Sequence, residues 1–245
     1  MTENERVSLL VEHLREMELP VMAGSLEQLH KSKEFATLDR AGLLEALIGQ
    51  AYQEKMTKQY ESRLTTGNLK GCPQTIDKCK DSADRCYLPT GIAETLASLN
   101  FIKEGLNICI LGPSDSGKSF LAKALGVQAC LKFRTAYFHC EEFLEMLLAL
   151  KVEDYKKYKR KATYYKNFDL LILDDFLLHT LTDEREVKIL FEIMEKRAES
   201  LKSTIVCSQR EPKSWGSMIL NDVVSANSIM KRATKHYTVV IKPQD

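Results

Sequence analysis

Residues 107–119 read Asn-Ile-Cys-Ile-Leu-Gly-Pro-Ser-Asp-Ser-Gly-Lys-Ser, and they carry the strongest indication of the fold. Its first five residues form a short apolar run that predicts a buried strand. The next eight, Gly112–Ser119, match the pattern GxxxxGK[ST] in full. Two glycines let the backbone turn tightly, so that successive N–H groups point at phosphate oxygens. The stretch therefore predicts a phosphate-binding loop between a strand and a helix, whose positive dipole end also favours an anion.

The loop predicts a site for a nucleoside triphosphate and Mg²⁺. Lys118 would place its charge on the β and γ phosphates, and the Ser119 hydroxyl is a candidate magnesium ligand. The backbone around them would cradle the phosphates. The residues expected to contact the nucleotide are Gly112, Pro113, Ser114, Asp115, Ser116, Gly117, Lys118, Ser119 and Phe120.

A second motif, a pair of acidic residues, follows the apolar run Leu170–Leu173. A buried strand there would deliver Asp174 beside the phosphate loop, where its carboxylate can hold the magnesium shell. Asp175 comes next and is a candidate for polarising the attacking water. The alternative is a strand that simply ends in two solvated acids. One further strand candidate, Thr135–Phe138, lies between the loop and this pair, and this order favours the ATPase branch of phosphate-loop proteins.

Apolar periodicity divides the chain into three parts. Residues 1–65 show helical spacing, broken at Pro20 and Gly24, and predict a helical N-terminal domain. Residues 66–90 lose periodicity and collect Gly, Pro, Asp and Lys, which predicts a linker. Residues 91–245 alternate strand and helix patterns, which predicts an α/β fold with a parallel sheet flanked by helices.

Composition excludes several classes of protein. The net charge of the 245 residues is +1, so any nucleic-acid signal must be local. No apolar run approaches the roughly 20 residues that span a bilayer. We expect a cytoplasmic protein without a membrane partner, whose seven cysteines are reduced thiols. A zinc site at Cys72, Cys79 and Cys86 is an alternative, although their spacing differs from the usual ligand pairs.

Residues 151–166 carry a local positive charge, with seven Lys or Arg residues against two acids. Four tyrosines are interleaved: Tyr155, Tyr158, Tyr164 and Tyr165. Lysines neutralise phosphates, and tyrosine rings can stack on bases. The segment is a candidate DNA contact, with a solvated charged surface as the alternative. The proposed contact residues are Lys156, Lys157, Lys159, Arg160 and Lys161.

These motifs together resemble a known family. The phosphate loop is followed by SFLAKALG, DLLILDD, LFEIMEKRAES, STIVCSQ, the single tryptophan and SIMKRATKH. This series resembles the IstB-like ATPases, AAA+ proteins that assist insertion-sequence transposases and are related to DnaC-type helicase loaders. The resemblance covers almost the whole chain. It implies an ATPase, a transposase partner, an ATP-dependent oligomer and binding to DNA, with duplex favoured over single strands.

The resemblance also implies roles for further residues. Gln209, with Ser208 before it, takes the position of sensor 1, which reads the γ-phosphate. Arg232 takes the position of an arginine that reaches the nucleotide of a neighbouring subunit. The sequence departs from the family where Asp175 replaces the usual Glu and where Lys231 replaces an acid. The family also continues into a segment that carries sensor 2, beyond the point where this sequence ends.

Two other functions stay open at this stage. A helicase loader would share the ATPase core but bind a replicative helicase and prefer single-stranded DNA. A structural subunit that binds nucleotide without hydrolysing it would account for the shorter acid, Asp175.

Overall fold

The computed structural model describes residues 1–32, 37–219 and 223–243, in two compact units, Met1–Ser62 and Arg63–Asp245. The first unit contains α1 (Glu3–Glu16), α2 (Pro20–Lys31) and most of α3 (Arg40–Thr66). Local sequence explains where two of these helices begin. Thr2 and Glu5 form a capping box at α1, and Pro20 occupies the first turn of α2, where its missing N–H costs nothing. The prediction of N-terminal helices is confirmed.

The core of the first unit is small. Its buried apolar residues come from α1 and α2, and partly buried side chains from α1 and α3 pack against them. They are Val7, Val11, Ala23 and Leu26, with Leu14 and Leu47 against them. Arg15 on α1 also pairs with Glu27 on α2 at 2.7 Å. An exposed pair of this kind adds little, so burial of the apolar residues is the main source of stability here.

The second unit is built on a six-stranded sheet in the order β1-β6-β2-β5-β4-β3. Strands β2 to β6 are parallel to one another, whereas the edge strand β1 is antiparallel to β6. The strands are β1 (Arg85–Leu88), β2 (Ile108–Leu111), β3 (Thr135–His139), β4 (Leu170–Asp174), β5 (Ser203–Ser208) and β6 (Tyr237–Pro243). Strand β2, which leads into the phosphate loop, therefore lies between β6 and β5.

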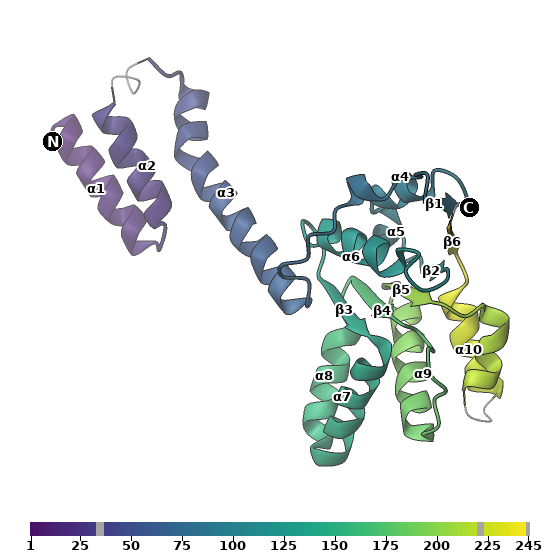
Figure 1. The fold of residues 1–245 in the computed structure, drawn as a ribbon. Helices are drawn as coiled ribbons and strands as arrows, with labels where there is room; N and C mark the ends of the chain where they lie inside the picture. The colour runs from purple at the N-terminus through teal and green to yellow at the C-terminus, as the bar shows by residue number, and fades with distance from the viewer. Residues whose placement is uncertain (33–36, 220–222, 244–245) are drawn as a thin grey trace. The chain divides into compact units, whose positions relative to one another are not determined.

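Helices cover both faces of this sheet (Figure 1). On one side lie α4 (Ile92–Ala97), α5 (Asn100–Lys103) and α6 (Lys118–Ala129). On the other lie α7 (Cys140–Glu153), α8 (Tyr155–Lys166), α9 (Glu184–Glu199) and α10 (Val223–Ala233). Two 3₁₀ helices, Ile76–Lys78 and Pro212–Met218, complete the described elements. The predicted α/β fold is confirmed. None of the described helices is long and apolar enough to cross a membrane.

Residues 66–90 are not the linker that the sequence predicted. Leu69 and Tyr87 are buried, and β1 pairs with β6 along its whole length. The segment therefore belongs to the second unit, which begins at Arg63. Its Gly, Pro and Lys content reflects turns around a single short strand rather than a flexible connection.

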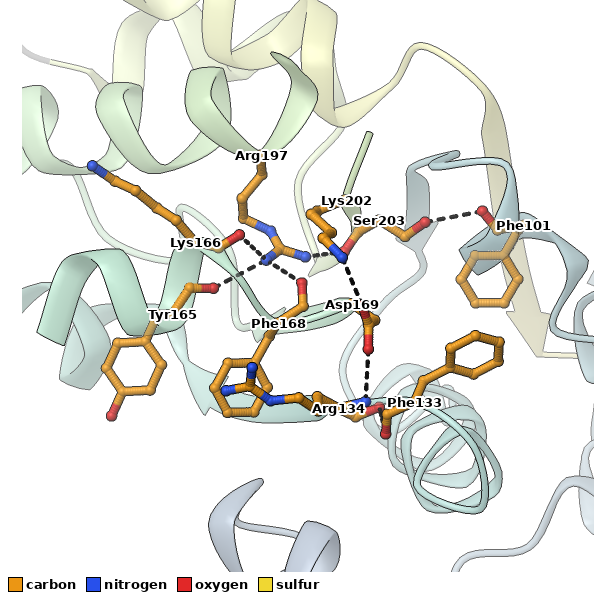
Figure 2. Close-up of polar contacts among 11 residues, drawn as sticks. Phe101, Phe133, Arg134, Tyr165, Lys166, Phe168, Asp169, Arg197, Lys202 and Ser203 are labelled. Carbon is orange, nitrogen blue, oxygen red and sulfur yellow. Dashed lines mark hydrogen bonds and ion pairs between the residues drawn. The ribbon is translucent and has the colours of Figure 1, made fainter. Parts of the chain in front are cut away.

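One buried cation joins several elements of the second unit (Figure 2). The Arg197 side chain on α9 is fully buried, and its guanidinium donates to the carbonyl oxygens of Tyr165, Phe168 and Ser203. It also donates to the carbonyl of Lys166 and to the Thr204 hydroxyl. The network fixes the end of α8 and the start of β4 and β5 against α9.

Candidate functional site

The phosphate loop connects β2 to α6 through backbone conformations that favour glycine. Gly117 has φ +100° and caps α6 in the left-handed region. At Gly112 a Cβ atom would lie 2.5 Å from the Ile241 carbonyl oxygen on β6 and 2.6 Å from Ser116 Oγ. A side chain at Gly112 would therefore push the loop away from the sheet.

Lys118 begins α6 and is held inside this loop. Only 5% of the residue is exposed, and Nζ donates to the Pro113 carbonyl at 2.6 Å. Burial lowers the pKa of Lys118, whereas the carboxylates of Asp174, Asp175 and Asp115 oppose the shift. The charge is thus partly desolvated, and among the described residues its hydrogen-bond partner is a single carbonyl. This arrangement leaves N–H groups of the lysine available to an anion.

The Ser116 hydroxyl gives an independent indication of a ligand. Its Oγ is buried and has no hydrogen-bond partner among the described residues. Buried polar groups are normally hydrogen-bonded, because an unmade bond costs about 1–3 kcal/mol. A phosphate oxygen in the loop would supply the missing partner. The residues present therefore fit a phosphate group.

The two acids after β4 have different surroundings. Asp174 is fully buried, and its carboxylate accepts from the Tyr137 hydroxyl at 2.5 Å and from the backbone N–H of Asp175 at 3.0 Å. Burial and the Asp174 carboxylate raise the pKa of Tyr137, so this phenol stays protonated and can donate. Tyr137, which the sequence analysis did not select, thus orients the predicted metal ligand.

Asp175 has a left-handed backbone, with φ 51°. Aspartate tolerates this region better than most residues, and such conformations concentrate at functional sites. The Oδ2 atom of Asp175 lies 3.0 Å from Nδ1 of His139, at the end of β3. His139 is a second residue that the sequence analysis did not select, and this contact fixes the direction of the Asp175 carboxylate.

A cavity of about 500 Å³ brings several of the predicted residues together, although Asp174 is not among those that line it. Lys118, Ser119, Asp175 and Gln209 all line it, so the loop, the second acid and the sensor position share one space. Ser208, before Gln209, is buried and donates through Oγ to the Phe176 carbonyl at 2.8 Å. This bond fixes the end of β5 to the loop after the acids. Carboxylate, hydroxyl and lysine groups there suit a magnesium nucleotide.

Arg232 lies elsewhere in the unit and does not line this cavity. Its Nη2 atom lies 3.1 Å from Glu195 Oε1 on α9. Its Nη1 atom donates to Ser228, which lies on α10 together with Arg232. An arginine that serves a neighbouring subunit would have to leave this ion pair. The role inferred from the resemblance stays a prediction.

Most of the lysine-rich segment forms helix α8. Its exposed surface contains fewer tyrosines than the predicted DNA contact. Tyr158 and Tyr165 are buried in the core with Ala162, so they are unavailable for stacking on bases. Their spacing puts them on one side of the helix, because residues four and three apart share a helical face. Tyr155 and Tyr164 are exposed, as are the cations Lys156, Lys157, Lys159 and Arg160. Lys161 is half-buried, with Nζ 5.6 Å from the centre of the Tyr164 ring.

The alternative zinc site finds no support in the described part of the chain. All seven cysteines are free thiols, and the described residues contain no group of three metal-binding side chains. Burial raises the pKa of Cys79 to about 11, so this thiol is protonated in the structure described.

The phosphate loop, the acidic end of β4 and the strand inserted between them define a phosphate-loop nucleotide-binding protein of the AAA+ class. Within that class the chain belongs to the family of IstB-like ATP binding proteins, whose model matches residues 12–244. The family resemblance inferred from the sequence is confirmed.

Curated relatives carry insertion-sequence names. The insertion sequence IS232 ATP-binding protein of Bacillus thuringiensis subsp. berliner is 33% identical over 58% of this chain and 56% of its own length. The insertion sequence ATP-binding protein y4pL of Sinorhizobium fredii is 30% identical over 91% of this chain and 88% of its own length.

Two similar solved structures support the fold alone, because both are distant in sequence. The DnaC helicase loader has a TM-score of 0.53 at 21% identity, over 70% of this chain and 98% of its own. The replication initiator DnaA, bound to AMPPCP and single-stranded DNA, has a TM-score of 0.56 at 20% identity, over 70% of this chain and 50% of its own.

Proposed function

We propose that this chain is an ATP-dependent DNA-binding ATPase that assists a transposase. The observation that carries the proposal is the single cavity lined by Lys118, Ser119, Asp175 and Gln209. Membership of the IstB-like ATP binding proteins and the insertion-sequence names of the relatives support it.

The roles of the residues follow from their chemistry. Lys118 and the loop N–H groups would hold the β and γ phosphates, and Gln209 would contact the γ-phosphate. Ser119 and Asp174 would hold Mg²⁺, which when bound neutralises charge on the phosphate oxygens. Asp175, oriented by His139, would accept a proton from the attacking water. Catalysis would then consist of positioning and electrostatic stabilisation.

ATP would also control assembly. Arg232 would leave Glu195 and reach the nucleotide of a neighbouring subunit, stabilising charge there. The exchange is feasible because an ion pair at a partly exposed position contributes little, typically below about 1 kcal/mol. An ATP-bridged oligomer would hold DNA for as long as ATP remains intact.

A direct test compares duplex and single-stranded DNA of equal length, each with and without ATP. ATP-dependent duplex binding in large complexes is the result expected of a transposase helper. A preference for single strands would instead support the alternative of a helicase loader, which the likeness of fold to the DnaC loader keeps open. Absence of binding to either DNA would contradict the proposal.

The Asp175→Asn variant tests hydrolysis. We expect phosphate release to fall by about 100-fold, because a general base typically contributes 10²–10⁴-fold. Asparagine tolerates the left-handed backbone at this position, so ATP affinity should stay within a few-fold of the parent. Phosphate release and nucleotide binding are measured on the same preparation.

Glu142→Gln is the matched control, because Glu142 is an exposed acid that lines a second cavity, which also touches Asp175 but does not include Lys118 or Ser119. It should hydrolyse ATP at the parent rate. Unchanged turnover in Asp175→Asn would remove Asp175 from the mechanism. No turnover in the parent protein would favour the alternative of a non-hydrolysing subunit.

Reversing the charge of α8 tests the DNA contact. Replacing Lys156, Lys157, Lys159 and Arg160 together with Glu should weaken duplex binding at least 10-fold at physiological salt. Each lost phosphate contact should also reduce the slope of log K against log salt by about 0.9. Filter binding or anisotropy across a salt series measures both quantities.

The control reverses two exposed lysines on α9, Lys188 and Lys196, each of which pairs with an acid on its own helix. This variant changes net charge without touching α8 and should bind DNA nearly as well as the parent. Equal affinity and equal salt slope in the parent and the α8 variant would contradict the proposed contact.

A further inference from the structure

Arg85 begins β1, the edge strand that the sequence analysis took for part of a linker. Its register partner on β6 is Pro243, and its carbonyl accepts from the Ser82 backbone N–H at 2.9 Å. Tyr87, two residues further on, has its side chain on the same face because strand side chains alternate. Tyr87 is buried, so the strand is anchored next to Arg85.

The Arg85 guanidinium lies directly over the phosphate loop. A Cβ atom placed on Gly117 would collide with its Nη1 atom. Arg85 also lines the cavity that holds Lys118, Ser119 and Gln209. The left-handed backbone favours glycine at 117, and the absence of a Cβ atom there leaves room for the Arg85 guanidinium.

The charge of Arg85 has no acidic partner. The residue is half-buried, yet it forms no ion pair with any described residue, although Asp115 and Asp175 line the same cavity. Burial raises the pKa of Tyr87 and of Cys79; Arg85 opposes the rise at Tyr87 through a side-chain contact and its charge, and the rise at Cys79 through its charge. A half-buried guanidinium without an anion has lost part of its hydration and gained no salt bridge in return.

We propose that Arg85 binds the phosphates of the nucleotide, as a second cation in the same subunit beside Lys118. The inference rests on the proposed nucleotide site. A guanidinium presents several N–H donors in a planar fork that matches phosphate oxygens, and charge-assisted bonds of this kind are among the strong ones. Phosphates are the fitting partner because Gly117 caps the N-terminus of α6, where N–H groups and the helix dipole gather anions.

The test is equilibrium binding of a fluorescent ATP and a fluorescent ADP to Arg85→Ala and Arg85→Lys. We expect Arg85→Ala to weaken both nucleotides by about 10- to 100-fold, the range of a charge-assisted hydrogen bond. Arg85→Lys keeps the charge but not the fork and should recover part of the loss. Competition by GTP should show an unchanged ratio of ATP to GTP affinity, because the contact does not involve the base.

Lys80→Ala is the matched control, since Lys80 is an exposed cation in the same segment. It should bind both nucleotides like the parent. The fluorescence of Trp215, which is buried in this unit, checks that each variant is folded. If Arg85→Ala fails to fold, Arg85→Gln, which keeps the first part of the aliphatic stem and loses the charge, replaces it.

Two results would overturn the inference. ATP and ADP affinities of the Ala or Gln variant within two-fold of the parent would show that Arg85 does not bind phosphate. A changed ratio of ATP to GTP affinity would place the side chain on the base instead. Failure of the parent protein to bind ATP at all would refute the proposed function rather than the role of Arg85 alone.

Discussion

Lys118→Ala should weaken ATP binding by at least 100-fold and abolish phosphate release. The lysine is almost fully buried beside the loop, and in the part of the chain that the structure describes it donates to the Pro113 carbonyl alone. Two phosphates would each gain a charge-assisted bond from it, at about 1.5–3 kcal/mol apiece, and about 2.7 kcal/mol corresponds to 100-fold in affinity. Titration with fluorescent ATP measures the loss.

The same variant should not unfold the protein. Burial lowers the pKa of Lys118, which means that the folded chain holds this charge at a cost when no phosphate is present. Removing it should therefore leave the free energy of unfolding unchanged or slightly increased. Weaker ATP binding with an unchanged free energy of unfolding identifies a binding residue. Loss of a structural residue would lower both the ATP affinity and the free energy of unfolding.

Lys132→Ala is the control, since Lys132 is an exposed lysine just beyond the end of α6. It should bind ATP like the parent. Lys118→Ala with parental affinity would mean that the loop does not hold the nucleotide through this lysine. That result would remove the main support for the proposed site.

The sequence predicted those parts of the fold that depend on residues adjacent to one another in the chain. Strands β2 and β4 are short apolar runs, of which β2 leads into the phosphate loop and β4 ends at Asp174, and both lie where the sequence placed them. The phosphate loop was identifiable because its glycines and lysine are fixed in spacing by backbone geometry. Such features need no knowledge of distant partners.

Strand β1 was missed because it is defined by a distant partner. Its four residues, Arg85–Leu88, show no long alternation, and they pair with Val240–Pro243 at the other end of the unit. Arg85 could not be placed at the phosphate loop until that pairing was known. His139 was missed for a similar reason, because its contact with Asp175 depends on the parallel register of β3 and β4.

In helix α8 the spacing of the buried residues was overlooked because the segment is so rich in lysine. Tyr158, Ala162 and Tyr165 have the spacing of one helical face, which predicts burial, whereas the many lysines suggested exposure of the whole segment. The structure satisfies both, with apolar residues inward and four cations outward. A lysine-rich helix can therefore present a DNA-binding surface and still anchor itself through its tyrosines.

Arg197 is the residue whose role the sequence least suggested, because a charged residue near the end of a helix is usually solvated. Burial lowers its pKa to about 9, and the negative charge of Asp169 opposes the shift. The pKa thus stays above neutral pH, so the folded chain keeps a buried guanidinium. That state is tolerable because carbonyl oxygens receive most of its N–H groups (Figure 2).

Arg197→Met should therefore lower the free energy of unfolding by about 3–5 kcal/mol, because several buried carbonyls lose their donor at once. Methionine keeps the unbranched apolar stem and most of the side-chain volume, so the loss reports mainly hydrogen bonding rather than a large cavity. Urea unfolding followed by the fluorescence of Trp215, which shares the core with α9, measures it. The tryptophan reports this unit alone, which keeps the transition interpretable in a chain of two units.

The control is Arg185→Met on the same helix, where the guanidinium is exposed and pairs with Asp183 at 2.7 Å. We expect a change below about 1 kcal/mol, as for other exposed ion pairs. Replacing buried charges with apolar residues can also be neutral when the remaining polar groups find partners. A loss below about 1 kcal/mol in Arg197→Met would therefore mean that water reaches the carbonyls of Tyr165 and Phe168, and that the junction of α8 and β4 does not depend on Arg197.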